Sequence, residues 1–302
     1  MDNESHEDIP EITFIVPKKR EIPNGYYDQR WVESIIQQNP ITCPLSGLSN
    51  FGNSCFINCV LQCLMYCPGL SFFSENIPNI VYEKSLNMHL FLHHFGLLSK
   101  DMKKLKVCHP KVFFQNLQII VPEFEPGYQQ DAHEFLLSLL NIFDDECARS
   151  FGKTHDYFDT PIHALFGSTL TEQKICGKCH HITSSTFHVL DISIPLNSVT
   201  IEDCITNFMS PGEAIPDFTC EQCNSVGTCS VESFFESTPY ILIITMMRFT
   251  STNKKIENNV DFDFQLDIDF CTKTGQHTLY ELFAIIIHNG HSIGSGHFTA
   301  AF

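Results

Sequence analysis

The most informative part of the sequence is Gly47-Leu48-Ser49-Asn50-Phe51-Gly52-Asn53-Ser54-Cys55-Phe56, which is followed by an apolar segment that runs to Cys67. Within Cys55–Cys67 the apolar residues recur in the i, i+4 rhythm of a buried helix, and Pro68-Gly69 ends it. The pattern predicts Cys55 in the first turn, where free backbone N–H groups and the helix dipole favour a thiolate. A thiolate there is typical of a nucleophile, and Asn50 is expected to donate a hydrogen bond to an oxyanion. The competing interpretation is a cysteine that only packs.

Three further cysteines follow Cys55 on the same predicted helix at four-residue intervals: Cys59, Cys63 and Cys67. They form one stripe, and a single helix face cannot surround a zinc ion tetrahedrally. We therefore predict that these three side chains pack in the core.

Composition excludes several classes of protein. The chain has 302 residues, 43% hydrophobic and 18% charged, which is typical of a globular protein. Its formal net charge of −17 gives nucleic-acid binding little support and suits a basic protein partner. The longest apolar run, at about Tyr240 to Met247, falls far short of the roughly 20 residues that span a bilayer, and residues 1–10 show no secretory signal. We expect no membrane association and a cytoplasmic and/or nuclear location.

The fourteen cysteines are then expected in a reducing compartment, where disulfides are uncommon. Two pairs have the spacing of metal-binding turns, Cys176-Gly-Lys-Cys179 and Cys220-Glu-Gln-Cys223. Four thiolates in two such turns suit a structural zinc ribbon with one ion. A redox role would need one such motif near a βαβ unit, and the two copies in a β-rich context argue against it.

The composition divides the chain into a polar leader that contains several prolines, residues 1–45, and one domain, residues 46–302. We predict that residues 1–45 pack loosely, with a short helix at 28–38. Predicted helices cover 55–67, 87–103, 110–120 and 129–145, and predicted strands cover 167–174, 183–194, 240–249 and 261–270. A hairpin is expected from 279–288 and 297–302. Helices followed by strands indicate an α+β architecture.

Three histidines lie close together near the end of the chain: His288, His291 and His297. Gly294 and Gly296 precede His297 and permit close approach of an extended backbone, so His297 is the best candidate for the base that serves Cys55. We expect the other two to be loop histidines. A metal site is the alternative, but the H-E-x-x-H spacing is absent.

A further polar segment, Gln129-Gln130-Asp131-Ala132-His133-Glu134-Phe135-Leu136, opens a predicted helix. Asp131 suits the first turn of a helix as a capping residue. Its functional role would be to pair with a cationic peptide.

Taken together, these segments resemble the ubiquitin-specific protease family of deubiquitinating cysteine peptidases. Gly47 to Gln62 looks like the family's cysteine box, Gln129 to Leu136 like its Gln-Gln-Asp-Ala-x-Glu-Phe segment, and Gly296-His297-Phe298 like the Gly-His-Tyr of its histidine box, with Phe for Tyr. The resemblance covers about residues 46–302.

The resemblance implies a papain-like fold with a thumb at about 46–165, fingers with the zinc ribbon at 166–235 and a palm at 236–302. It implies hydrolysis of the bond after the C-terminal glycine of ubiquitin, with ubiquitin and ubiquitinated proteins as partners of a monomer. Cys55 would be the nucleophile, His297 the base and Asn50 the oxyanion donor. Asp131, with Gln130 and Gly296, would bind the substrate tail.

One departure from the family concerns the group that orients the histidine. The family places an Asp or Asn beyond the histidine box, whereas this sequence ends at Phe302. Three alternatives follow: the catalytic domain is C-terminally incomplete, Asn289 or a partner supplies the orienting group, or activity is weak. A catalytically weak ubiquitin-binding scaffold and a protease for another ubiquitin-like modifier are the competing functions.

Overall fold

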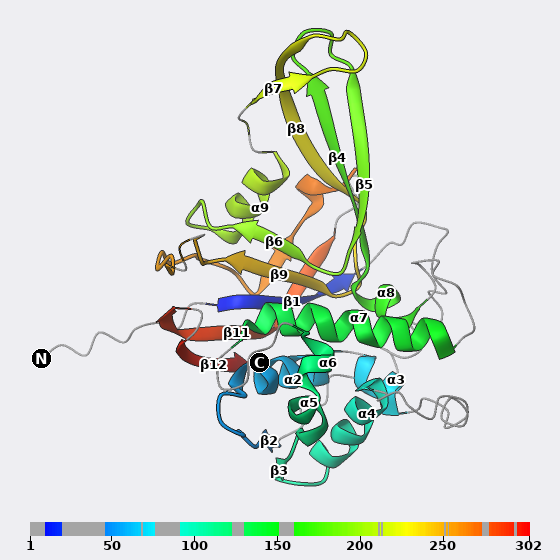
Figure 1. The fold of residues 1–302 in the computed structure, drawn as a ribbon, viewed down its shortest axis with the longest axis vertical. Coiled ribbons are helices and arrows are strands. Elements are labelled where there is room, and N and C mark those ends of the chain that lie inside the picture. The colour runs from blue at the N-terminus through cyan, green and yellow to red at the C-terminus, as the bar shows by residue number, and fades with distance from the viewer. Residues whose placement is uncertain are drawn as a thin grey trace, which may run out of the picture.

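The computed structural model describes residues 10–19, 46–67, 69–75, 91–122, 130–150, 160–210, 212, 214–250, 252, 254–273, 278–292 and 295–302. Figure 1 shows three regions: a helical region at one end, a central sheet, and a second sheet that extends away from the body. Helices dominate the first part and strands the second, so the predicted mixture of helices and strands is confirmed. The expected helix at 28–38 lies outside the described residues.

The helical region contains seven helices among the described residues: α2 (Cys55–Tyr66), α3 (Leu70–Glu75), α4 (Phe91–Met102), α5 (Lys111–Gln115), α6 (Leu117–Ile120), α7 (Ala132–Ser150) and α8 (Pro161–Phe166). α2 is buried on nearly every side, as its sequence predicted. Cys59, Cys63 and Cys67 lie in this core, and burial raises the pKa of both Cys63 and Cys67.

The helix predicted over 110–120 is divided into α5 and α6 at Asn116. The Asn116 side chain donates a hydrogen bond of 2.8 Å to the carbonyl of Val112. Such bonding of an Asn side chain to nearby backbone competes with helical hydrogen bonding, which explains the interruption.

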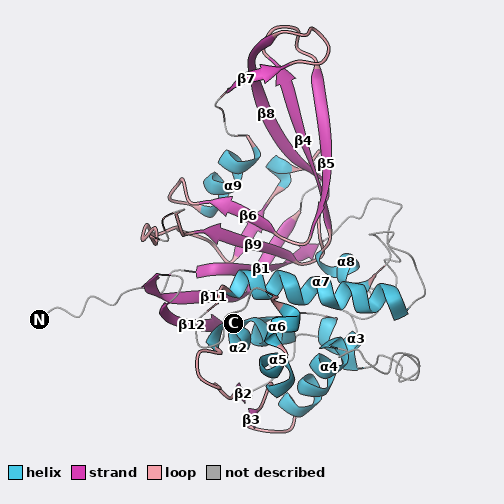
Figure 2. Cartoon of the chain, viewed as in Figure 1, coloured by secondary structure: helices cyan, strands magenta, loops and turns pink. Residues whose placement is uncertain are grey.

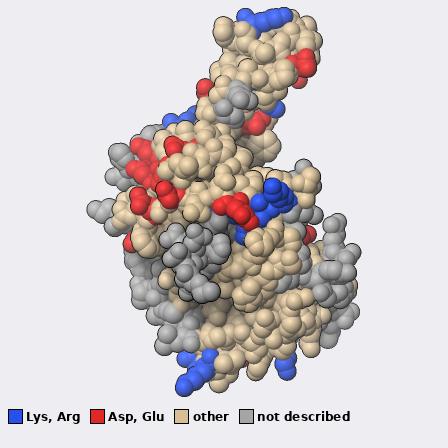
Figure 3. All heavy atoms as spheres, turned by 90° about the vertical axis from the view of Figure 1, so that its left-hand side faces the viewer, with Lys and Arg blue, Asp and Glu red and all other residues tan. Residues whose placement is uncertain are grey.

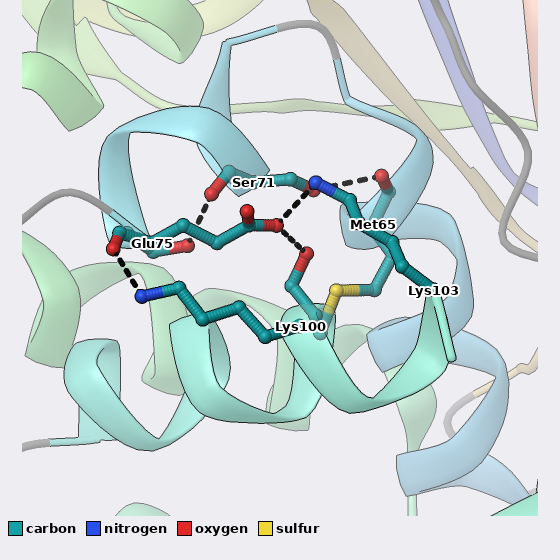
Figure 4. Close-up of polar contacts among 7 residues, drawn as sticks. Met65, Ser71, Glu75, Lys100 and Lys103 are labelled. Carbon is teal, nitrogen blue, oxygen red and sulfur yellow. Dashed lines mark hydrogen bonds and ion pairs between the residues drawn. The ribbon is translucent and has the colours of Figure 1, made fainter. Parts of the chain in front are cut away.

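Helix α3 packs against α4 through one carboxylate (Figure 4). Glu75 binds Lys103 at 2.6 Å and accepts a bond from Ser99, and its carbonyl accepts a 2.6 Å bond from Lys100. Gly96 makes this close approach possible, because a Cβ there would lie against the backbone of Ser74. The end of α2 is fixed in turn, since Ser71 donates to the carbonyl of Met65 at 2.8 Å.

The central sheet has six strands: β10 (Gln265–Asp267), β11 (Leu279–Ser292), β1 (Pro10–Lys19), β9 (Leu242–Met247) and β6 (Ile192–Pro195) in that order, with β12 (Ser295–Ala301) paired to β11. β6 and β9 are parallel and the other neighbours are antiparallel. β11 and β12 form the predicted hairpin.

The position of β1 differs from the prediction of a loosely packed leader. Residues 10–19 lie between β9 and β11, with Phe14 paired to Ile243 on one side and Ala284 on the other. The apolar run Ile12-Thr13-Phe14-Ile15-Val16 has the composition of an interior strand, and the surrounding charged and proline residues obscured it.

The central sheet is covered on both faces. Along β9, Ile243 belongs to the core beneath α2, whereas Leu242, Ile244 and Met246 belong to a second core with α9 (Ile201–Met209). This alternation is the period-two pattern of a strand, so the sheet separates the two cores.

The second sheet has four antiparallel strands in the order β5 (Ile182–Val189), β4 (Ser168–Cys176), β8 (Val226–Ser237) and β7 (Ile215–Thr219). Figure 2 shows it projecting from the body, with the turns that carry the paired cysteines at its far end. The predicted strand at 261–270 is mostly wrong, because only Gln265–Asp267 is a strand and Asp269–Cys271 is a 3-10 turn.

Candidate active site

A cavity of about 470 Å³ lies between the start of α2, the segment before it and β12. It is lined by Ser46, Gly47, Leu48, Asn50, Cys55, Asn58, Cys59, Gln62, His297, Phe298, Thr299, Ala300 and Phe302. Three of the predicted site residues, Cys55, Asn50 and His297, thus share one cavity. Gly296, Gln130 and Asp131 are not among its lining residues.

Cys55 is the first residue of α2, as predicted, and its side chain is buried within the cavity wall. At this position the backbone N–H groups of the first turn have no partner within the helix. They and the helix dipole favour negative charge on the sulfur.

Asn50 is fixed by a short chain of hydrogen bonds. The Phe51 N–H donates to Ser54 Oγ at 2.9 Å, and Ser54 Oγ donates to Asn50 Oδ1 at 2.9 Å. Because Oδ1 is occupied as an acceptor, the Nδ2 group of Asn50 retains its N–H donors. An amide donor in the same cavity as Cys55 suits stabilisation of an oxyanion.

Two residues of α2 that the sequence did not single out hold this segment in place. Asn58 Nδ2 donates to the carbonyl of Ser49 at 3.2 Å, and Gln62 Nε2 donates to the carbonyl of Ser46 at 2.9 Å. Asn58 and Gln62 follow Cys55 by three and seven residues, which places all three on one face of the helix, and this spacing was the available signal. The helix that presents Cys55 therefore also positions the backbone next to Asn50.

His297 lies near the start of β12 and its side chain is exposed toward the cavity. Gly296 has φ +151, and a Cβ at this position would lie 2.5 Å from the carbonyl oxygen of Asn289. The close approach that the glycines predicted is therefore present at Gly296.

The three histidines do not converge on a common point. His288 is buried in β11 with its ring 4.7 Å from that of Phe298, whereas His291 is exposed and pairs with Glu257 at 3.0 Å. Both His288 and His291 lie in β11 and are strand residues, so the expectation that they are loop histidines is wrong. Burial, followed by the charge of Lys255, lowers the pKa of His288 to about 4.

Asn289 is the cross-strand neighbour of His297 in the β11–β12 pair. Opposite residues of an antiparallel pair place their side chains on the same face of the sheet. Within the described part of the chain, no side chain makes a hydrogen bond to the His297 imidazole that would fix its orientation.

Asp131 caps α7, as its position in the sequence predicted. Its Oδ1 accepts the His133 N–H at 2.7 Å, and its carbonyl accepts the Phe135 N–H at 3.1 Å. Among the described residues the other carboxylate oxygen, Oδ2, has no partner. Gln130 lies next to it and is half-buried, while Gln129 lies outside the described residues.

The four cysteines of the two C-x-x-C motifs come together at the end of the second sheet. The sulfur atoms of Cys176, Cys179, Cys220 and Cys223 lie within 4.8 Å of one another. The residues that follow the motifs, His180 and Asn224, have φ of 59 and 50, and their N–H groups donate to the carbonyls of Cys176 and Cys220. Four sulfur donors on two tight turns could bind a zinc ion.

A cysteine at the start of a buried helix, with a histidine and an amide donor across one cavity, is the arrangement of a thiol-dependent hydrolase. The sequence matches the family described as ubiquitin carboxyl-terminal hydrolase over residues 46–302. The chain belongs to this family, whose members have a papain-like cysteine peptidase fold.

Individual relatives agree with this assignment. Ubiquitin carboxyl-terminal hydrolase 4 of Arabidopsis thaliana is 28% identical over 290 residues, covering 84% of this chain and 80% of that protein. Ubiquitin carboxyl-terminal hydrolase 23 of the same plant is 26% identical over 272 residues, covering 84% of this chain and 31% of that protein. Human ubiquitin carboxyl-terminal hydrolase 17-like protein 15 is 28% identical over 264 residues, covering 84% of this chain and 46% of that protein. The chain thus spans less than half the length of two of these relatives.

Proposed function

We propose that this chain is a thiol-dependent deubiquitinase that cleaves the peptide or isopeptide bond after the C-terminal glycine of ubiquitin. The observation that carries the proposal is the single cavity shared by Cys55, His297 and Asn50. Membership of the ubiquitin carboxyl-terminal hydrolase family supports the same conclusion.

In this mechanism His297 accepts the thiol proton and the Cys55 sulfur attacks the carbonyl carbon of the terminal glycine. The Asn50 amide donates to the oxygen that becomes negative. The imidazolium then gives its proton to the departing amine, which leaves ubiquitin bound to Cys55 as a thioester. His297 next accepts a proton from water, and the hydroxide attacks the thioester carbon. The C–S bond then breaks, the imidazolium returns its proton to the Cys55 sulfur, and ubiquitin leaves with a free carboxylate.

Asn289 is the residue that we propose as the orienting group for His297. Its amide oxygen, on the same face of the hairpin, suits an acceptor for one ring N–H of the imidazole. Such a bond would select the tautomer whose other nitrogen faces Cys55.

Substrate binding is proposed to use the acidic character of the protein. Asp131 presents its Oδ2 to a cationic side chain in the ubiquitin tail, and Gln130 and Gly296 line the path of that tail. Figure 3 shows Asp and Glu side chains gathered on one face, toward the left of the view and below the projecting sheet, and the net charge is −17. An acidic surface of this kind favours a basic partner.

The three regions of the fold are proposed to act as thumb, palm and fingers. The helical region is the thumb, the central sheet the palm, and the four-stranded sheet the fingers. At the tip of the fingers Cys176, Cys179, Cys220 and Cys223 would hold one zinc ion, which would supply structural stability and no step of the reaction. The cysteine content supports a reducing cytoplasmic and/or nuclear location, and we propose a monomer. No helix in the described stretches is long and apolar enough to cross a membrane.

The test is labelling by ubiquitin that carries a C-terminal electrophile, combined with hydrolysis of a fluorogenic ubiquitin amide. We expect covalent labelling and turnover by the wild-type protein, and loss of both in Cys55→Ala. Cys63→Ala is the matched control, because this sulfur lies in the core on the same helix and does not line the cavity. Wild-type protein that is folded yet neither labelled nor active would contradict the proposal.

The scaffold alternative is favoured by one observation, which is that no described side chain fixes the His297 ring. It predicts measurable ubiquitin affinity with negligible hydrolysis. A protease for another ubiquitin-like modifier would be identified by competition between that modifier and ubiquitin for labelling of Cys55.

A further inference from the structure

We infer that His133 and Asp191 form a positioning pair for substrate binding. Their contact holds the start of α7 against the junction of the two sheets, and it thereby positions the Asp131 carboxylate. The inference rests on the proposed function of Asp131 and names two residues that act through it.

The contact between the two residues is direct and largely buried. His133 Nε2 lies 2.7 Å from Asp191 Oδ2, and the side chains are 21% and 12% exposed. An imidazole N–H that donates to a carboxylate at this distance makes a strong, directional bond. Partial burial protects it from the screening that weakens surface ion pairs.

The Asp191 carboxylate is held by hydroxyl groups on two strands of the central sheet, β6 and β9. It lies in the short bend between β5 of the second sheet and β6 of the central sheet. Its Oδ2 also faces the hydroxyls of Ser193 at 3.3 Å and Thr245, on β9, at 3.4 Å. The carboxylate is therefore a fixed point at the junction of the two sheets, and α7 is attached to that point through His133.

His133 transmits this attachment to Asp131 through its backbone. Its N–H donates to Asp131 Oδ1 at 2.7 Å, while its ring is bound to Asp191. The two bonds orient the Asp131 carboxylate with Oδ1 engaged and Oδ2 available to a cation. If the ring were released, the first turn of α7 would lose its attachment to the sheets, and Asp131 would be less well placed.

This arrangement predicts an effect on substrate binding and little effect on chemistry. Cys55, Asn50 and His297 are held by other contacts, on α2 and β12, which do not involve His133. A pre-organised carboxylate lowers the cost of binding a cationic tail segment, so its loss should appear in KM and leave kcat nearly unchanged.

The experiment is steady-state hydrolysis of a fluorogenic ubiquitin amide by the full chain. We expect His133→Ala and Asp191→Asn to raise KM about tenfold, with kcat within about twofold of wild type. His133→Gln, which retains a neutral N–H donor, should recover most of the loss. Asp101→Asn, an exposed aspartate on α4, is the matched control and should behave as wild type.

A double-mutant cycle separates positioning from an independent contact. If His133 acts through Asp131, then Asp131→Ala/His133→Ala should have the same KM as Asp131→Ala alone. Additive effects, an unchanged KM in His133→Ala, or a fall in kcat without a change in KM would each overturn the inference. If His133→Ala does not fold, the cycle is run with Asp191→Asn and judged by the same outcomes. Failure of the proposed function is distinguishable, because the wild type itself would then show no turnover.

Discussion

Asn289 and His297 face each other across the β11–β12 hairpin, on the same side of the sheet. Phe298 and His288, one position along, make the adjacent pair, and both are buried. The pairing places the Asn289 amide beside the proposed catalytic histidine, which lines the cavity.

We expect Asn289→Ala to lower kcat by at least tenfold with little change in KM, because the His297 imidazole would lose the group that selects its tautomer. The measurement is the pH profile of kcat with a fluorogenic ubiquitin amide. Asn289→Asp, which keeps an acceptor at the same place, should retain more activity than Asn289→Ala and shift the acid limb of the profile. Equal activity of Asn289→Ala and wild type would assign the orienting role to another group.

Asn50 gives a second prediction. Asn50→Ala should lower kcat by about 10²–10³, because a donor to the oxyanion is lost. Asn50→Asp is the sharper variant, since it preserves the acceptor for Ser54 and removes the N–H donors. Ser54→Ala should cost less, because the Asn50 donor remains. Full activity of Asn50→Asp would exclude the amide as the oxyanion donor.

The lowered pKa of His288 predicts how the free energy of unfolding depends on pH. Burial first, and then Lys255, lower the pKa of His288 to about 4 in the folded protein, from 6.5 as the ordinary value. Between these two values the unfolded chain binds a proton that the folded protein does not, so stability falls as the pH decreases from about 6.5 to 4. At pH 5 the expected loss from this group is on the order of 2 kcal/mol.

The check is urea unfolding at pH 7 and pH 5. His288→Gln should reduce the difference between the two pH values, whereas the exposed His291→Ala should leave it unchanged. An undiminished pH dependence in His288→Gln would show that other groups cause it.

The four-cysteine cluster at the end of the second sheet predicts the zinc content of the protein. We expect about one zinc per chain after dialysis, and a ratio well below one for Cys220→Ser, with a lower unfolding temperature. Cys229→Ser is the matched control. Cys229 is the cross-strand neighbour of Cys176 in the β4–β8 pair, but its sulfur is not part of the four-sulfur cluster. Equal zinc content in the two variants would argue against a site made of these four cysteines.

Much of the fold could be predicted from the sequence where one pattern dominated. The buried helix from Cys55 and the β11–β12 hairpin have strong periodicity and clear boundary residues. The segment 261–270 alternates in the same way, yet only Gln265–Asp267 pairs with β11. Alternation describes which side chains can be buried, whereas strand pairing depends on a partner elsewhere in the chain.

In the candidate site, the cysteine, amide and histidine side chains that line one cavity could be singled out from the sequence, whereas the residues that hold them in place could not. Cys55, Asn50 and His297 have distinctive chemistry in distinctive contexts. Asn58, Gln62 and Asp191 act through hydrogen bonds to groups that are distant in the sequence, and such partners become visible only after folding. The His133–Asp191 contact joins residues from different elements, and no local pattern indicates it.

The position of β1 within the central sheet determines where the folded domain of this protein begins. The family match begins at residue 46, yet a strand from residues 10–19 separates β9 from β11. An expression boundary chosen from the match alone would leave two inner strands with open edges, and such edges invite self-association. For this chain, the unit that folds therefore begins upstream of the unit that sequence similarity defines.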